Sequence, residues 1–204
     1  MRGGFFIWPI VAASIIAAVL IIERAITLSV AQDGVEQLWL LTHDYLKKGD
    51  FTSARLALTK KKGSIAAYFI GLIFSRSFDA EMKETFLSQL QTNEIRRLET
   101  NMHIIDIIAR ITPLLGLLGT VTGMIKAFIV IQESGGVINP EVLAGGIWEA
   151  MITTAAGLIV AIPTLIAAGI LTRRIDNCIA DMEELHHRFA LLLQTKSIET
   201  SDEI

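Results

Sequence analysis

Residues 111–131 read ITPLLGLLGTVTGMIKAFIVI, a run with a single charge, at Lys126. A bilayer core about 30 Å thick needs about 20 helical residues, so this run predicts a membrane-spanning helix. Gly119 and Gly123 form a GxxxG pair, and Gly116 lies close to the same side. Small residues let two helices approach closely in lipid, where no hydrophobic effect drives their association. The run therefore predicts a span that packs tightly against a neighbour.

Two further stretches have a similar composition. Residues 5–22 carry no charge, and residues 142–172 carry only Glu149. The chain has 18 Lys or Arg and 21 Asp or Glu among 204 residues, and all but two of these charges lie outside the three stretches. With 52% hydrophobic residues and a mean hydropathy of +0.53, the chain combines membrane-type and solvated segments. We predict an all-α membrane protein with three transmembrane helices.

The composition also excludes several classes of protein. A single cysteine, Cys178, allows no internal disulfide. The net charge of −3 provides no basic field for nucleic acid. The spans hold no Ser–His or Cys–His set, and His186 and His187 have no further ligand-spaced partners. We therefore expect neither an enzyme nor a metal site.

The distribution of Lys and Arg predicts the orientation. There are 12 in residues 23–110, four after residue 172 and none in residues 132–141. Basic segments stay in the cytoplasm, so the N-terminus and the short turn should lie outside. The first apolar run ends without a good small-x-small cleavage site, which favours a retained signal anchor over a cleaved signal peptide. The predicted order is a first transmembrane helix (1–28), a cytoplasmic helical region (29–103), a second transmembrane helix (104–131), a short outer turn (132–141), a third transmembrane helix (142–172) and a cytoplasmic helical tail (173–204).

Helix boundaries in the region 29–103 follow from capping residues. Gly49 should end a helix that includes residues 38–46, and Asp50 or Thr52 should start the next, which runs to about Leu58. Residues 60–62 are three lysines, read as a solvated loop with binding of anionic lipid as the alternative. A short apolar helix is expected at residues 65–74.

Two helices should extend beyond the bilayer. No Gly or Pro occurs between Glu81 and Thr112, which predicts one unbroken helix over residues 81–131. The third helix should begin near Glu141, with Asn139 as its N-cap, and run to about residue 193 with a bend at Pro163. Two such columns reaching into the cytoplasm suggest a bundle, or ring, built by several subunits.

Small residues recur along the second and third spans and predict a tightly packed hairpin. Those singled out for helix packing, together with the two prolines inside the spans, are Gly116, Gly119, Gly123, Gly146, Gly157, Pro113 and Pro163.

Glu149 is the sharpest feature of the third span. A carboxylate inside a membrane helix costs about 2.5 kcal/mol or more, so it needs a partner, water or a proton. Lys126 lies at a similar depth on the antiparallel neighbour, which makes an ion pair one reading. The other reading is that Glu149 faces a lumen and takes part in proton transfer. Thr153 shares the face of Glu149, whereas Thr154 is rotated about 140° away on an ideal helix.

Residues 112–125 (TPLLGLLGTVTGMI) resemble the second-span signature of the ExbB and TolQ proteins, and residues 146–163 (GIWEAMITTAAGLIVAIP) resemble their third-span signature. The pair Glu23 and Arg24 and the turn at residues 48–51 are also similar. The resemblance covers essentially the whole chain and is greatest to ExbB.

The resemblance implies a protein of the bacterial inner membrane with a periplasmic N-terminus. It implies a ring, in the family a pentamer, around an ExbD- or TolR-like membrane partner, and a TonB- or TolA-like protein driven by the proton gradient. By position, Glu149, Thr120 and Thr154 match pore-lining residues, with Thr153 added from its shared face. The essential proton-binding Asp of the family lies on the partner. Lys126 departs from the pattern, because its position is often uncharged.

The leading hypothesis is a motor subunit that energises a TonB-like protein for outer-membrane import, with protons as the coupling ion and no cofactor. One alternative is a TolQ-like subunit for envelope integrity, or another motor. Another is a passive membrane scaffold in which Glu149 pairs with Lys126. A transporter with its own pocket fits less well, because three spans show no inverted repeat.

Overall fold

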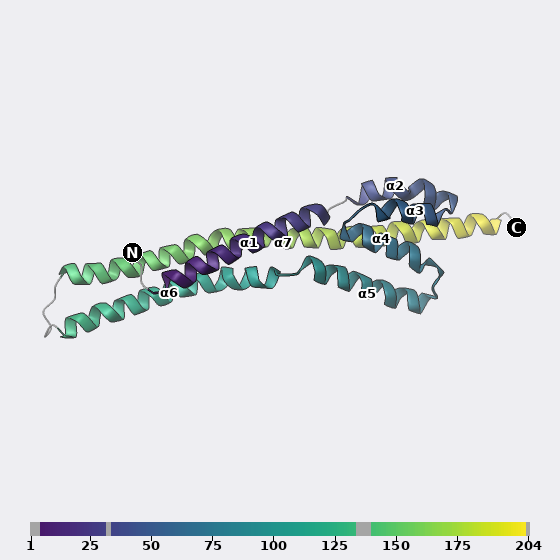
Figure 1. The fold of residues 1–204 in the computed structure, drawn as a ribbon. Helices are drawn as coiled ribbons and strands as arrows, with labels where there is room; N and C mark the ends of the chain where they lie inside the picture. Colours follow the sequence, from purple (N-terminus) through teal and green to yellow (C-terminus); the bar gives the residue numbers. More distant parts are fainter. Residues whose placement is uncertain (1–4, 32–33, 134–139, 203–204) are drawn as a thin grey trace. The chain divides into compact units, whose positions relative to one another are not determined.

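The computed structural model describes residues 5–31, 34–133 and 140–202, and in these ranges the chain is helical without strands (Figure 1). The elements are α1 (Ile7–Ala31), α2 (Val35–Lys48), α3 (Phe51–Thr59), α4 (Ser64–Phe74), the 3-10 turn η1 (Ser75–Ser77), α5 (Ala80–Leu98), α6 (Met102–Glu133) and α7 (Pro140–Asp202). The predicted all-helical fold is confirmed. The expected cap at Asn139 lies outside the described residues.

Three of these helices are long and apolar enough to cross a membrane. The apolar parts are Ile7–Ser29 of α1, the whole of α6, and Leu143–Thr195 of α7. The prediction of three helices long and apolar enough to span a membrane is therefore confirmed. At 63 residues, α7 is about three times as long as a bilayer core requires, and it continues past the predicted end near residue 193.

The chain divides into two compact units. One, here called the span unit, comprises Met1–Arg24 and Asn101–Ile170. The other, here called the bundle unit, comprises Ala25–Thr100 and Leu171–Ile204. The boundaries between the units thus follow Arg24, Thr100 and Ile170. The change from apolar to mixed composition thus coincides with a change of packing partners.

The unbroken helix predicted over residues 81–131 is wrong. Helix α5 ends at Leu98 and α6 begins at Met102, and between them Asn101 has φ of 63°. A residue in the left-handed region cannot continue a right-handed helix, and asparagine is among the few non-glycine residues that tolerate this conformation. The Asn101 carbonyl then accepts the first hydrogen bonds of the new helix, from the Ile104 and Ile105 N–H groups. The absence of Gly and Pro therefore did not guarantee a continuous helix.

The helix end predicted at Gly49 and the helix start predicted at Asp50 are confirmed. Gly49, with φ of 79°, ends α2. Asp50 caps α3 by accepting a hydrogen bond from the Ser53 N–H at 3.0 Å, and Asp79 caps α5 by accepting one from the Met82 N–H at 2.7 Å. Hydrogen bonds from the Ser53 side chain and backbone hold the pKa of Asp50 below its ordinary value. These caps satisfy N–H groups that a helix leaves without internal partners.

The core of the bundle unit forms around α4, because this helix is apolar along most of its length. Phe69 is fully buried; its ring stacks on Trp39 of α2 and meets Phe189 of α7 edge to face, with ring centroids 6.2 Å apart in each case. The Tyr68 hydroxyl lies 3.1 Å from His186 Nδ1. Three elements far apart in sequence thus share one aromatic core.

Two leucines of α3 provide a matched test of this packing. Leu58 is fully buried, whereas Leu56, two residues earlier, is 66% exposed. Leu58→Ala should cost about 2–5 kcal/mol of unfolding free energy, because it removes buried methyl groups and leaves a cavity. Leu56→Ala should leave thermal unfolding in detergent nearly unchanged, and equal losses in the two variants would contradict this core.

The helix break at Asn101 can be tested in the same assay. Asn101→Gly should keep the unfolding temperature, because glycine adopts positive φ freely. Asn101→Val should lower it, since a β-branched side chain tolerates the left-handed conformation far less well than asparagine, at a cost of roughly 1–2 kcal/mol. If the valine variant matched the glycine variant, the left-handed turn would not be present in solution.

Candidate functional site

Helix α6 and the first part of α7 run side by side in the span unit (Figure 1). Glycines make this approach possible. A Cβ atom added at Gly123 would lie 2.8 Å from the Ala150 Cβ, and one at Gly146 would lie 2.9 Å from the Ala127 Cβ. Real Cβ atoms essentially never come this close, so the helices must separate if either glycine gains a side chain.

The same interface continues along both helices. A Cβ atom at Gly116 would lie 3.0 Å from the Thr154 Cα, and one at Gly157 would lie 2.7 Å from the Thr112 carbonyl oxygen. At Gly119 it would overlap the Thr153 side chain. All five glycines singled out for packing are therefore at the contact between α6 and α7.

The two prolines differ from the glycines. Pro113 lies inside α6 and is half-buried, whereas Pro163 lies inside α7 and is exposed. The structure thus places the glycines, and not Pro163, at the helix contact of the span unit.

The threonine hydroxyls of the site are engaged with backbone carbonyls. Thr154 donates to the Gly116 carbonyl across the interface at 2.8 Å. Thr153 donates to the Glu149 carbonyl at 3.0 Å, and Thr120 donates to the Leu117 carbonyl at 2.6 Å, each within its own helix. The Thr154 hydroxyl therefore joins the two helices, whereas the other two satisfy their own helices.

A cavity of about 180 Å³ opens beside this interface. Both ionisable residues of the apolar stretches, Lys126 of α6 and Glu149 of α7, line it. The full lining is Phe5, Phe6, Gly119, Thr122, Gly123, Lys126, Glu149 and Thr153. The structure thus brings Glu149 and Thr153 together, as their shared face predicts. Of the residues that the structure describes, Thr120 and Thr154 are not part of this lining.

Glu149 and Lys126 face the same cavity without forming an ion pair. Among the described residues, no ion pair within 4.0 Å joins them. Glu149 is half-buried and Lys126 is exposed. The ion pair, one of the two readings of the sequence, is therefore absent from the described geometry. The carboxylate lines the cavity without a direct ionic partner in the described residues.

Three lining residues were missed by reasoning from the sequence. Thr122 lies four residues before Lys126, so helical spacing could have placed it on the same face. Phe5 and Phe6 open the first apolar run and give no signal of their own, because only the packing of α1 against the other spans brings them to Glu149.

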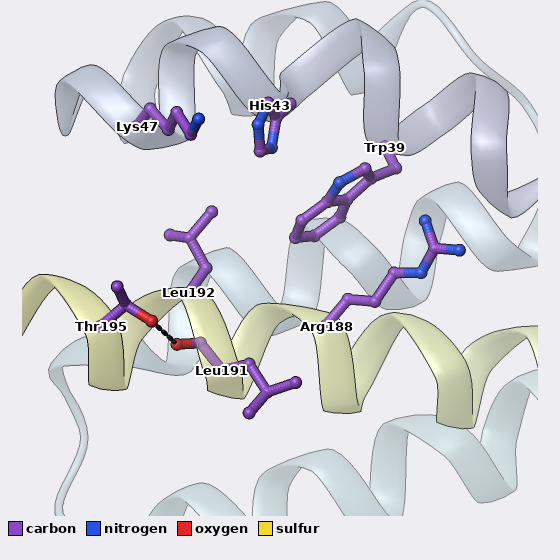
Figure 2. Close-up of a pocket in the computed structure, with 7 residues that line it drawn as sticks. All are labelled: Trp39, His43, Lys47, Arg188, Leu191, Leu192 and Thr195. Atoms are coloured by element: carbon purple, nitrogen blue, oxygen red, sulfur yellow. Dashed lines mark hydrogen bonds between the residues drawn. The ribbon is translucent and has the colours of Figure 1, made fainter.

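A second cavity, of about 680 Å³, lies in the bundle unit between α2 and α7. Figure 2 shows its lining, which is Trp39, His43, Lys47, Arg188, Leu191, Leu192 and Thr195. The Arg188 guanidinium binds the carboxylates of Glu36 at 2.9 Å and of Glu184 at 2.6 Å. Its charge is therefore already compensated by two acidic groups.

The sequence did not point to this second cavity, although Trp39, His43 and Lys47 follow one another at four-residue spacing on one face of α2. The Nδ1 atom of His43 is buried there without a hydrogen-bond partner. As for metals, the described ranges contain no group of three or more His, Cys, Asp or Glu residues that could hold an ion.

Two glycines of α7 test the close approach of the helices. Gly157→Ala should lower the unfolding temperature, because the new methyl group meets the Thr112 carbonyl and overpacking costs about 1–3 kcal/mol. Gly169→Ala is the matched control, since nothing lies within 4 Å of the added atom. Thermal unfolding that is unchanged in both variants would contradict the contact.

Comparison with known proteins shows the family of this chain. The profile of the MotA/TolQ/ExbB proton channel family matches residues 57–184. The chain is 29% identical to biopolymer transport protein exbB1 of Vibrio cholerae serotype O1 over 190 residues, which cover 88% of this chain and 80% of that protein. It is 34% identical to biopolymer transport protein ExbB of Aquifex aeolicus over 123 residues, which cover 60% of this chain and 81% of that protein. The chain belongs to the MotA/TolQ/ExbB proton channel family and is an ExbB-like member of it.

Proposed function

We propose that this chain is a motor subunit of the bacterial inner membrane that uses the proton-motive force. In this proposal, several copies form a ring around an ExbD-like partner and energise a TonB-like protein for import across the outer membrane. Family membership, the three apolar helices and the similarity to biopolymer transport proteins support this assignment. The observation that carries it is Glu149, a half-buried carboxylate of an apolar helix that lines a cavity together with Lys126.

The proposed topology has the N-terminus and the turn at residues 132–141 in the periplasm. The distribution of Lys and Arg supports it. So does the position of Phe5 and Phe6, which line the same cavity as Lys126 and Glu149. Lys126 precedes the end of α6 by seven residues, and Glu149 follows the start of α7 by nine. The start of α1 therefore lies toward the same end of the span unit as the turn.

In the proposed mechanism, protons pass through a lumen shaped by Glu149 and the neighbouring threonines to an acidic group on the partner helix. The coupling ion is the proton, and no cofactor takes part. Alternating protonation changes which subunit of the ring the partner helix prefers, and movement of that helix follows. The close contact of α6 and α7 supplies rigidity, because helices held by backbone approach resist separation.

Two alternatives remain distinguishable. A TolQ-like role would use the same machinery with a TolA-like partner, and the similarity to proteins named ExbB favours the import role. A passive scaffold would use Glu149 only to pair with Lys126. The described geometry, in which these two side chains form no ion pair, favours the motor.

The test replaces Glu149 in a strain that depends on this chain for energised uptake. Glu149→Gln keeps the size of the side chain but removes its charge, and we expect loss of most uptake while the oligomer still assembles, as judged by native mass spectrometry. Glu133→Gln, in the last turn of α6, is the matched control and should leave uptake unchanged. Full uptake by Glu149→Gln would refute the role given to this carboxylate.

A charge exchange separates the motor from the scaffold. In a scaffold held by an ion pair, Glu149→Lys combined with Lys126→Glu should restore what either single change removes. In the motor, the exchange should assemble an oligomer without restoring uptake, because the carboxylate then sits on the wrong helix. Recovery of uptake in the double variant would favour the scaffold.

A further inference from the structure

We propose that Phe5 and Phe6 form an aromatic wall that closes the Glu149 cavity and limits the access of water to this carboxylate. The inference deepens the proposed function and rests on it for its meaning, since a proton pathway must separate the carboxylate from uncontrolled solvent. The existence of the wall is argued from the positions of the side chains, and its test measures solvent access to Glu149 and not uptake.

The rings of Phe5 and Phe6 lie together at the cavity. Both line the cavity together with Glu149 and Lys126. Their centroids are 5.7 Å apart with an interplanar angle of 84°, an edge-to-face contact that holds the rings together as one surface. The Phe5 and Phe6 carbonyls accept hydrogen bonds from the Trp8 and Ile10 N–H groups, each at 3.4 Å, which ties the pair to the start of α1.

The start of α1 is packed against the rest of the span unit. Ile10, on the first turns of this helix, is 1% exposed, so the start of α1 is seated in the span unit. Phe6 is half-buried and Phe5 is 74% exposed. Phe6 thus forms the inner part of the wall, whereas Phe5 covers its outer side.

The cavity is lined by two charged side chains and two hydroxyls. Its charged lining is one carboxylate, Glu149, and one ammonium group, Lys126, and no ion pair joins them in the described structure. The Thr122 and Thr153 hydroxyls donate to backbone carbonyls of Leu118 and Glu149. Charges that lack a direct partner in an apolar helix pair require solvation. A cavity of about 180 Å³ that contains these side chains has room for several water molecules.

An apolar wall beside such a cavity controls exchange with bulk solvent. Aromatic rings do not supply the hydrogen bonds that a continuous chain of water molecules needs. They also lower the local dielectric constant, which strengthens the electrostatic interaction between Glu149 and Lys126. Removal of the rings should therefore open the carboxylate to solutes from the side where α1 begins.

The experiment measures solvent access to Glu149 in the purified full-length chain. A water-soluble carbodiimide with glycine ethyl ester modifies accessible carboxylates, and peptide mass spectrometry reports the extent at each site. Phe5→Ala with Phe6→Ala should raise modification of Glu149 severalfold relative to Glu133, an exposed carboxylate of α6 that serves as internal reference. Phe5→Leu with Phe6→Leu, which keeps an apolar wall, should remain near the wild type.

Phe128→Ala is the matched control, because Phe128 is 63% exposed on α6 and does not line the cavity. In this variant, the extent of carbodiimide modification at Glu149 should equal that in the wild type. Equal modification of Glu149 in the wild type and in the double alanine variant would overturn the proposal that Phe5 and Phe6 limit solvent access. A rise of the same size in Phe128→Ala would also overturn it, since loosening of the spans would then be the cause.

Variants that unfold are recognised by their unfolding temperature. If the double alanine variant is unstable, Phe5→Ala alone replaces it, because a ring that is 74% exposed contributes little to packing. Failure of the proposed function is a separate outcome: Glu149→Gln would then support full uptake while the wall still governed modification of the wild-type carboxylate.

Discussion

The close approach of α6 and α7 is the constraint on which the rest of the span unit depends. Lipid offers no hydrophobic effect to hold two apolar helices together, so contact must come from packing and from hydrogen bonds between backbones. Glycines on both helices remove the side chains that would keep the axes apart. The hydrogen bond from Thr154 to the Gly116 carbonyl then adds a polar link that is possible only at this short distance.

This approach also determines where the ionisable groups lie. With Gly123 against Ala150, the antiparallel register brings Lys126 and Glu149 to one edge of the interface. They share a cavity there without forming an ion pair, because the contact is made by the small residues beside them. Lys126 thus adds a positive charge to the cavity that Glu149 lines.

The bundle unit is held by different forces. Its core is aromatic and aliphatic, with Phe69 between Trp39 and Phe189, and burial of these side chains stabilises it as in a water-soluble protein. Because α7 contributes to both units, one continuous helix carries two kinds of packing. The small residues of its first half suit helix contacts in lipid, and its second half buries an apolar face that includes Ile175, Met182, Leu185 and Phe189.

The three apolar helices, the helix ends at Gly49 and Asp50 and the small-residue faces were all predictable from the sequence, because they depend on composition, capping and helical period. The break at Asn101 was not predictable in the same way, because asparagine tolerates the left-handed conformation but also occurs inside helices. The sequence also placed Glu149 and Lys126 at a similar depth without deciding whether they touch. The register of α6 against α7 keeps Glu149 and Lys126 from forming an ion pair, and the packing of α1 brings Phe5 and Phe6 to the cavity. Both features belong to the tertiary structure, because they depend on contacts between segments that are distant in the sequence.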